Sequence, residues 1–270
     1  MKKYLVIGNP ITHSLSPELH NYWIKENGIN GIYNKVKLND KDLKELFLKI
    51  KNKEISGVNI TVPFKRDVIA YLDQLSLEAE KTQSVNTINL EKDKIIGHNT
   101  DIDGFELAIK DANYDVEGKR VLILGAGGVV PSVIFALYKM RVLSVTISNR
   151  TKTKAENLKN LFNDLDIVDW GEASNFDMII NATSIGLKKD DRLNLDFSKF
   201  QDSEFFYDVI YNPKETNFLK DGKNLGKKTE NGKKMFIYQA AKAFKIWHGI
   251  DPKINEQVIG LLDKWLKLEF

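Results

Sequence analysis

The chain has 270 residues, of which 42% are hydrophobic and 29% are charged. This length and composition argue against intrinsic disorder and favour a globular protein with two domains. The 40 basic and 37 acidic residues leave a formal net charge of +3, too small to indicate a surface that binds nucleic acid. Because cysteine is absent, a disulfide scaffold, a thiolate nucleophile and a cysteine zinc site are excluded.

Two apolar segments bear on localisation. Residues 4–7 form a run too short for a secretory signal, and this run predicts a buried strand. The longest uncharged stretch, residues 121–138, is interrupted by three glycines and Pro131, so it predicts a strand, a glycine turn and an apolar helix, not a membrane span. We therefore expect a cytoplasmic protein that does not bind a membrane.

Strand and helix patterns alternate along the chain, which predicts an α/β fold with parallel sheets covered by helices. In the first third, strands are expected at 4–7, 32–37, 57–61, 87–91 and 94–97, and helices at 17–27, 40–50, after Pro63 and at 103–112. Beyond a turn at 115–119, strands at 120–124, 144–148, 178–181 and 205–208 alternate with helices after Pro131 and at 151–162 in a doubly wound order. Amphipathic helices at 233–248 and 254–268 have no strand partner, and such a tail can pack back on the first domain.

A glycine-rich turn, Gly125-Ala126-Gly127-Gly128, follows the predicted strand at 120–124 and precedes a helix. Backbone N–H groups at the start of such a helix can bind a pyrophosphate. The turn departs from the GxGxxG pattern, because Val130 stands at the third glycine position. Taken alone, the motif is equally compatible with a tight strand-to-helix connection.

The end of the next strand carries cations. Asn149, Arg150 and Thr151 follow that strand, with Lys152 and Lys154 close behind, and no carboxylate is present. A site that prefers NAD usually places Asp or Glu here, whereas a ribose 2′-phosphate accepts charge-assisted hydrogen bonds from cations. The alternative is a solvated helix start with incidental basic residues, but cations there oppose the helix dipole. The pattern therefore favours NADP.

The first third also carries polar side chains next to buried strands. Each alone has an ordinary structural explanation, such as helix capping by Ser16 or a surface position for Lys65. Ligands in open α/β sheets bind at the carboxyl ends of strands, and these groups all fall there, so we expect a binding site. The residues are Ser14, Ser16, Asn59, Thr61, Lys65, Asn86 and Asp101.

These motifs closely resemble those of the shikimate dehydrogenase family, and the resemblance runs in order through the whole chain. The matching segments are NPITHSLSP at 9–17, NITVPFK at 59–65, VNT at 85–87, NTDIDG at 99–104, the glycine turn, NRT at 149–151, NATSIG at 181–186, DVIYNP at 208–213 and the residues from Gly232 through Met235 to Gln239. The resemblance implies the reversible, NADPH-dependent reduction of 3-dehydroshikimate to shikimate in aromatic amino acid biosynthesis. It also implies a substrate-binding and catalytic domain at 1–102, completed by 236–270, and a Rossmann-like NADP-binding domain at 103–235.

The resemblance further implies roles for individual residues. Ser14, Ser16 and Thr61 would hold the substrate carboxylate, while Lys65, Asn86, Asp101, Tyr211 and Gln239 surround the ring oxygens with Asn59 beside them. Gly125, Ala126, Gly127, Gly128 and Val129 would bind the pyrophosphate, and Asn149, Arg150, Thr151 and Lys154 the 2′-phosphate end. Val209 and Gly232 would lie on the nicotinamide side.

The chemistry of the reaction agrees with Lys65 and Asp101 as catalytic residues. When a hydride reaches the substrate ketone, the carbonyl oxygen gains negative charge and needs a proton. A lysine ammonium supplies both, and a nearby carboxylate favours the charged lysine and fixes its orientation. The sequence leaves open which of the two finally transfers the proton.

Some positions depart from the family pattern, mostly on the cofactor side. Val130 and Pro131 replace a small and a basic residue, and Lys233-Lys234 replaces a glycine-containing pair, so cofactor preference follows less firmly than reaction type. The four histidines have no third ligand in register, and we expect no metal.

Three other functions stay open at this point. A quinate dehydrogenase that uses NAD would need an acidic residue near Asn149, a non-catalytic NADP-binding regulator would be expected to lose Lys65 and Asp101, and a folate dehydrogenase would not need the paired serines. The expected partner is a small-molecule substrate, and the chain is expected to be a monomer or a homodimer.

Overall fold

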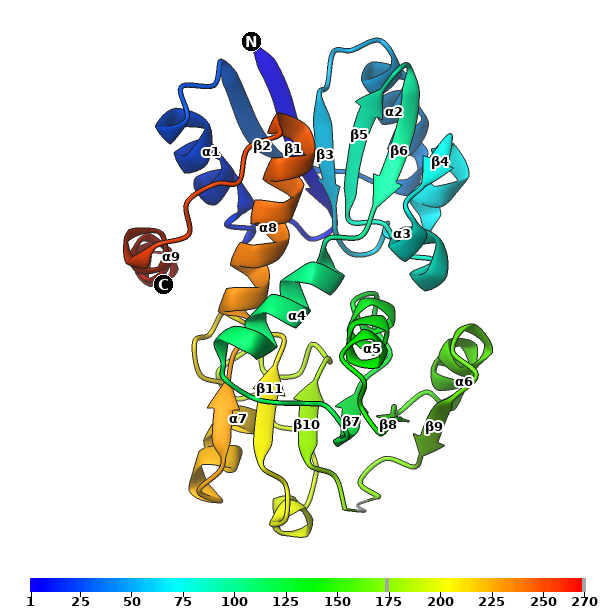
Figure 1. Ribbon diagram of the computed structural model, residues 1–270, viewed down its shortest axis with the longest axis vertical. Helices are drawn as coiled ribbons and strands as arrows, with labels where there is room; N and C mark the ends of the chain where they lie inside the picture. Colours follow the sequence, from blue (N-terminus) through cyan, green and yellow to red (C-terminus); the bar gives the residue numbers. More distant parts are fainter. Residues whose placement is uncertain (173–174, 269–270) are drawn as a thin grey trace. The chain divides into compact units, whose positions relative to one another are not determined.

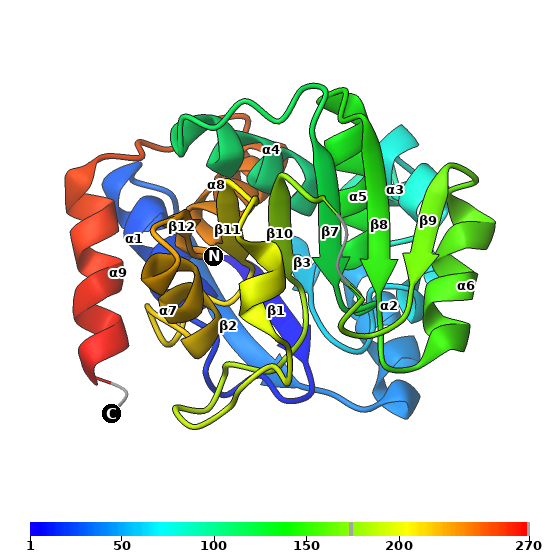
Figure 2. The ribbon, with the colours of Figure 1, turned by 90° about the horizontal axis from the view of Figure 1, so that it is seen from below.

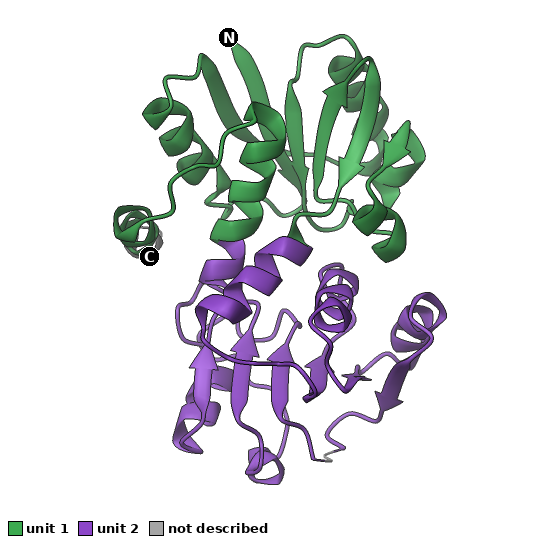
Figure 3. Cartoon of the chain, in the orientation of Figure 1, with its two compact units in different colours: residues 1–101, 237–270 green, residues 102–236 purple. Residues whose placement is uncertain are grey.

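The computed structural model describes residues 1–172 and 175–268, and the chain has an α/β fold built from two compact units. Unit 1 comprises residues 1–101 and 237–270, and unit 2 comprises residues 102–236 (Figure 3). The chain passes from one unit to the other at the start of helix α4 (Asp101–Asp111) and within helix α8 (Lys233–His248). The C-terminal helices therefore belong mainly to the same unit as the N-terminal strands.

Unit 1 is built on a six-stranded sheet with the order β2-β1-β3-β5-β6-β4 (Figure 1). The strands are β1 (Lys2–Gly8), β2 (Gly31–Lys37), β3 (Gly57–Ile60), β4 (Gln74–Leu75), β5 (Thr87–Glu91) and β6 (Lys94–His98). All neighbouring pairs are parallel except those that involve β5, which runs antiparallel to both β3 and β6. The expectation of an all-parallel sheet was wrong for this strand, because β5 and β6 form a hairpin through Lys92 and Asp93.

Side chains that alternate along the strands of unit 1 fill two cores. On one face, Ile7 and Ile60 pack with the apolar stripe of α2 (Leu43–Lys51). On the other face, Tyr4 contacts Trp247 of α8, and α8 crosses this face of the sheet (Figure 1). Helix α1 (Ser16–Glu26) adds Trp23, whose ring lies 5.7 Å from that of Phe244. Both faces of the sheet are thus covered by helices.

Several elements of unit 1 differ from the sequence expectations. The helix expected after Pro63 is a turn followed by the 3-10 helix η2 (Asp67–Tyr71), so Lys65 lies in the turn and not in a helix. Helix α4 begins at Asp101, two residues earlier than expected. The short elements β4 and α3 (Leu77–Thr82) were not predicted, because segments of two to six residues carry too little periodicity. Residues 40–42, expected as the start of a helix, form the 3-10 helix η1 (Asp40–Asp42) ahead of α2.

Unit 2 contains a six-stranded sheet in which every neighbouring pair is parallel. The strand order is β12-β11-β10-β7-β8-β9 (Figure 2). The chain begins at the central strand β7, adds β8 and β9 on one side, and then returns to add β10, β11 and β12 on the other side. This is the doubly wound arrangement, in which dinucleotides bind where the strand order reverses. The strands are β7 (Arg120–Leu124), β8 (Ser144–Ser148), β9 (Leu165–Val168), β10 (Met178–Asn181), β11 (Phe205–Asp208) and β12 (Lys228–Glu230). The reversal point lies between β7 and β10.

Helices bury both faces of the unit 2 sheet. Helix α5 (Val130–Lys139) buries Val133, Ile134 and Leu137, and Phe105 of α4 contacts Tyr207 of β11 edge to face. Helix α7 (Asn217–Asn224) packs an apolar stripe against the other face. The remaining elements are α6 (Lys152–Leu161), η3 (Phe197–Phe200) and, in unit 1, α9 (Glu256–Leu268). Within the described ranges, no helix is long and apolar enough to span a bilayer.

Candidate active site

A buried ion pair joins the two predicted catalytic residues. The amine Nζ of Lys65 lies 2.5 Å from Oδ2 of Asp101, and the two side chains are 12% and 9% exposed. Lys65 comes from the turn after β3, and Asp101 is the first residue of α4, where the helix dipole favours a negative charge. A pair this shielded from water interacts more strongly than a surface ion pair. The ammonium is therefore held at a fixed place.

Asn86 fixes the orientation of that carboxylate. Its amide Nδ2 donates to Oδ1 of Asp101 at 2.9 Å, so the two carboxylate oxygens have different partners. The oxygen Oδ1 of Asn86 accepts from the backbone N–H of Thr100 at 2.7 Å and from the Thr87 hydroxyl at 3.1 Å. These two donors determine which end of the Asn86 amide faces Asp101. The Lys65–Asp101 pair thus rests on a fully hydrogen-bonded buried amide.

The remaining predicted substrate residues of unit 1 lie around this pair or in the loop before α1. Asn59 is buried and donates to the backbone oxygen of Asn86 at 3.1 Å, and Oε1 of Gln239 in α8 lies 3.4 Å from Nδ2 of Asn86. The Ser14 hydroxyl donates to the Ser16 hydroxyl at 3.2 Å, and Ser16 begins α1. Thr61 follows β3 directly, and its backbone N–H donates to Ile7.

The sheet of unit 1 explains how these residues come together. The strands β1, β3 and β6 are parallel, so their carboxyl ends meet at one edge of the sheet. Asn86 precedes β5, but β5 runs antiparallel, so the start of this strand lies at the same edge. Asn86 was expected there as a residue at the carboxyl end of a strand, and its position is correct for a different topological reason.

The glycine turn of unit 2 lies at the reversal point of the sheet. Gly125 has a φ of +109°, and a Cβ atom there would lie 3.0 Å from the backbone of Ala182 after β10. The turn therefore approaches the neighbouring strand end more closely than a residue with a side chain allows. Gly127 and Gly128 are exposed ahead of α5. This is the backbone arrangement in which helix N–H groups bind a pyrophosphate.

The cations predicted to bind a 2′-phosphate are exposed where β8 ends. Arg150, Lys152 and Lys154 form no ion pair with any residue in the described part of the chain. Asn149 donates to the backbone oxygen of Thr151 at 2.7 Å, which shapes the loop between β8 and α6. Three cations without a protein carboxylate beside them suit an anionic ligand group. The residues present therefore fit NADP.

Val209 and Gly232, the two residues expected on the nicotinamide side, lie against each other. A Cβ atom on Gly232 would lie 2.1 Å from the backbone oxygen of Val209, so only glycine fits there. Tyr211, expected to contact substrate, also belongs to unit 2, where its ring stacks on Phe236 at 4.7 Å. Its position with respect to the substrate residues of unit 1 stays a prediction.

A buried carboxylate supports the loop that carries Val209. Asp208 accepts hydrogen bonds from the Thr216 hydroxyl at 2.6 Å, from the backbone N–H of Ile210 at 3.0 Å and from Asn181 at 3.1 Å. It thereby links the ends of β10 and β11 to the start of α7. Burial raises the pKa of Asp208 to about 6, although these hydrogen bonds act in the opposite direction.

Comparisons with known proteins identify the family. Residues 6–88 match the shikimate dehydrogenase substrate binding domain, residues 106–207 match shikimate / quinate 5-dehydrogenase, and residues 234–256 match the shikimate 5'-dehydrogenase C-terminal domain. A protein of Pelagibacter ubique named shikimate dehydrogenase (NADP(+)) is 55% identical over 262 residues, which cover 97% of this chain and 99% of that protein. The chain belongs to the shikimate dehydrogenase family.

Solved structures of this family share the fold. Shikimate dehydrogenase from Aquifex aeolicus is 38% identical and superposes with a TM-score of 0.88 over 96% of both chains. Shikimate 5-dehydrogenase from Thermus thermophilus, solved in complex with NADP(H) and shikimate, is 30% identical with a TM-score of 0.88 over the whole of both chains. The resemblance seen in the sequence and the predicted fold class are thus confirmed.

Four residues of the site region were not predicted from the sequence. Thr87 and Thr100 lie inside motifs that were recognised, but only the structure shows their hydrogen bonds to Asn86. Tyr33 reads as an apolar core residue of β2, and Asp208 as the end of a buried strand. Their polar atoms find partners from other elements, and no local pattern signals such contacts.

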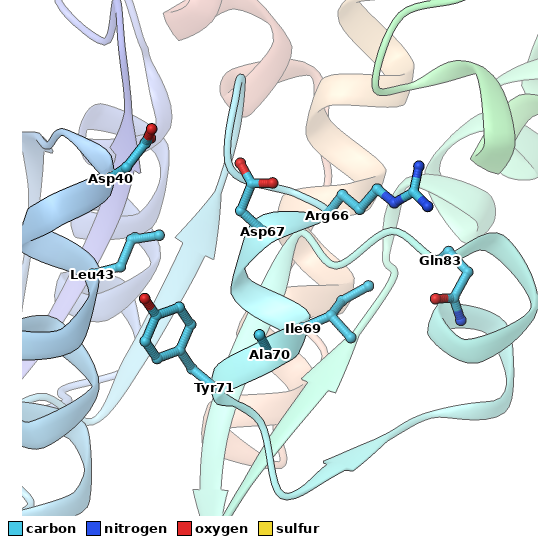
Figure 4. A pocket seen from close by; sticks show the side chains of 8 residues that line it. All are labelled: Asp40, Leu43, Arg66, Asp67, Ile69, Ala70, Tyr71 and Gln83. Atoms are coloured by element: carbon cyan, nitrogen blue, oxygen red, sulfur yellow. The ribbon is translucent and has the colours of Figure 1, made fainter. Parts of the chain in front are cut away.

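A separate open pocket of unit 1 lies beside the turn that carries Lys65 (Figure 4). Its walls include Arg66 and Asp67, which directly follow Lys65, and Tyr71, whose ring stacks on Phe47 at 4.9 Å. None of the predicted site residues lines it. Because Lys65 is turned toward Asp101 while Arg66 lines the pocket, the Lys65–Asp101 pair and this pocket are distinct features.

The raised pKa of Asp208 predicts how stability depends on pH. The folded state binds the proton of the Asp208 carboxyl more tightly than the unfolded state does. This protonation therefore stabilises the folded state below pH 3.8, and its contribution is lost as the pH rises to about 6. A shift of this size corresponds to about 3 kcal/mol. In urea unfolding between pH 4 and 7, wild type should therefore lose stability relative to Asp208→Asn.

Asp191 provides a control with the opposite sign. Backbone hydrogen bonds from Lys188 and Gly186 lower the pKa of Asp191, so its contribution to stability is lost as the pH falls. Asp191→Asn should therefore show a wild-type advantage that grows with pH. A difference between wild type and Asp208→Asn that stays constant from pH 4 to 7 would contradict the assignment.

Proposed function

We propose that this chain catalyses the reversible, NADPH-dependent reduction of 3-dehydroshikimate to shikimate, a step of aromatic amino acid biosynthesis, with Lys65 and Asp101 as its catalytic residues. The observation that carries the proposal is the buried ion pair between them, oriented by Asn86. An enzyme that adds a hydride to a ketone must supply a proton to the same oxygen. The pair holds a protonated amine in a fixed place for that purpose.

The protein residues act on the ketone oxygen. NADPH, when bound, supplies the hydride. The ammonium of Lys65 stabilises the negative charge that develops on the oxygen and holds the proton that neutralises it. Asp101 keeps the amine oriented through its Oδ2, while Oδ1 is held by Asn86. In the reverse direction, the same pair accepts the proton of the shikimate hydroxyl.

The other polar residues bind the rest of the substrate in this proposal. Ser14, Ser16 and Thr61 hold the carboxylate, since hydroxyl groups at the start of α1 and after β3 can donate to its oxygens. Asn59, Asn86, Gln239 and Tyr211 contact the ring hydroxyls. The amides offer both donors and acceptors, as a ring bearing a ketone and hydroxyl groups requires.

Unit 1 would thus be the substrate-binding and catalytic domain, and unit 2 the NADP-binding domain. The reversal point of the unit 2 sheet and its glycine turn support binding of the pyrophosphate by Gly125, Ala126, Gly127, Gly128 and Val129. Asn149, Arg150, Thr151 and Lys154 would bind the 2′-phosphate end, and Val209 and Gly232 the nicotinamide side. The uncompensated cations after β8 favour NADP over NAD.

No observation favours the alternative functions. A non-catalytic regulator has no use for a buried Lys65–Asp101 pair, which is costly unless both partners are present. A quinate dehydrogenase that uses NAD would place a carboxylate near Asn149, where this chain has cations.

Replacement of Lys65 tests the catalytic assignment. Lys65→Ala removes the ammonium, so we expect kcat for shikimate oxidation to fall by roughly two to four orders of magnitude while NADPH affinity is kept. Steady-state kinetics and a fluorescence titration with NADPH measure the two quantities. Lys81→Ala, which changes an exposed lysine of α3, is the matched control and should be unaffected. Near-normal turnover of Lys65→Ala would remove this residue from the mechanism.

Replacement of Arg150 tests the cofactor assignment. Loss of one charge-assisted hydrogen bond to a phosphate costs about 1.5 to 3 kcal/mol, so Arg150→Ala should raise KM for NADP roughly 10- to 100-fold. KM for NAD, which lacks the 2′-phosphate, should stay unchanged. Arg192→Ala removes an arginine that lies near Asp221 and serves as the control. An equal rise in KM for both cofactors would show that Arg150 does not read the phosphate.

A further inference from the structure

Tyr33 of β2 places its hydroxyl between two predicted substrate-binding residues. The side chain is 1% exposed, and its hydroxyl donates to Oδ1 of Asn59 at 2.7 Å. Burial raises the pKa of Tyr33 well above its ordinary value, and a hydrogen bond with the Ser16 side chain offsets part of that rise. The hydroxyl therefore stays protonated and acts as a donor. It touches one residue expected at the carboxylate and one expected at the ring.

Aromatic contacts hold the Tyr33 ring in place. His20 of α1 stacks on it with an interplanar angle of 1° and a centroid distance of 4.3 Å, and Trp247 lies 6.0 Å away. Burial, with His248 nearby, lowers the pKa of His20 to about 3, so this imidazole is neutral at physiological pH. Neither of its ring nitrogens has a hydrogen-bond partner in the described chain. His20 therefore packs against the ring and does not compete for the hydroxyl.

The backbone oxygen of Asn86 and the hydroxyl of Tyr33 together fix the Asn59 amide, one at Nδ2 and the other at Oδ1. With Oδ1 accepting from Tyr33, the nitrogen Nδ2 uses both of its hydrogens, one on the backbone oxygen of Asn86 and one on the Thr87 hydroxyl at 3.0 Å. The hydrogen-bonding capacity left on Asn59 is then a lone pair of Oδ1. A substrate hydroxyl that binds Asn59 must therefore donate to this oxygen.

The same direction of donation continues to the catalytic pair. Because Thr87 accepts from Asn59, its own hydrogen is free to point to Oδ1 of Asn86 at 3.1 Å. That bond leaves Nδ2 of Asn86 as the donor to Asp101. From Tyr33 to Asp101, each group donates to the next, and Lys65 donates to Asp101 from the other side. Without the Tyr33 hydroxyl, the backbone oxygen of Asn86 still holds Nδ2 of Asn59, but Oδ1 of Asn59 loses the donor that holds it.

We propose that Tyr33 is a positioning residue of this enzyme, whose hydroxyl holds Oδ1 of Asn59 in place and so prepares this oxygen to accept a hydrogen bond from a ring hydroxyl of the substrate. This inference rests on the proposed function. It concerns substrate binding more than the chemical step, because Thr100 also holds Asn86 from the other side.

Kinetics of Tyr33→Phe, which removes a single oxygen, test the proposal. We expect KM for shikimate to rise about tenfold, the effect of one net hydrogen bond, with kcat within about threefold and KM for NADP unchanged. Tyr4→Phe is the matched control. Tyr4 faces Tyr33 in the register of β1 and β2 and also contacts Trp247, but its hydroxyl makes no hydrogen bond in the described chain. The KM of Tyr4→Phe for shikimate should stay at the wild-type value even if both variants lose stability.

A double-mutant cycle shows whether Tyr33 acts through Asn59. If it does, Tyr33→Phe combined with Asn59→Ala should have the same KM for shikimate as Asn59→Ala alone. Additive effects, or an unchanged KM in Tyr33→Phe, would overturn the proposal. This result is independent of the catalytic assignment. That assignment is tested separately, by the turnover of shikimate in wild type and by the loss of kcat in Lys65→Ala.

Thr87 offers a second route if Tyr33→Phe fails to fold. Thr87→Val keeps the shape but loses the hydroxyl that accepts from Asn59 and donates to Asn86, so it should raise KM for shikimate and also lower kcat. Thr87→Ser keeps the hydroxyl and should restore the wild-type value. Equal KM values for the two variants would contradict the inferred direction of the hydrogen bonds.

Discussion

The site of this protein depends on one buried ion pair. Lys65 and Asp101 lie 36 residues apart in the sequence, and a lysine ammonium loses much of its hydration at 12% exposure. The cost of this desolvation is offset only if the carboxylate is close and well oriented. Asn86, Thr87 and Thr100 supply that orientation, and the strand ends of the unit 1 sheet bring all five residues to one edge. The antiparallel direction of β5 is needed for this, because it places Asn86 and Thr87, at the start of the strand, at the same edge.

Unit 2 meets a different constraint, which is the close approach of backbone to backbone. Gly125 and Gly232 lie where a Cβ atom would clash with a neighbouring strand end or loop. The buried carboxylate of Asp208 holds the loop after β11, which carries Val209, through hydrogen bonds to Ile210 and Thr216. Exposed cations at the end of β8 add the charge that a phosphate needs. Backbone geometry and exposed charge, supported by the buried side chains around Asp208, therefore characterise this part of the molecule.

Much of this arrangement could be predicted from the sequence. Strong apolar runs gave the central strands to within one or two residues, and the motifs after them indicated the site. The direction of β5 could not be predicted, because its two-residue hairpin turn uses Lys92 and Asp93, both with positive φ, in place of the Asn-Gly or Asp-Gly pairs that signal such turns. The role of Tyr33 was equally hidden, since its hydroxyl partner comes from another strand 26 residues away.

The proposed mechanism requires that Lys65 and Asp101 both contact the reacting oxygen of the substrate. A crystal structure of the chain with shikimate and NADP tests it most directly. We predict that Nζ of Lys65 and a carboxylate oxygen of Asp101 both lie within about 3.2 Å of the same ring hydroxyl. Shikimate bound away from both residues, or a Lys65 side chain turned out to solvent, would contradict the account.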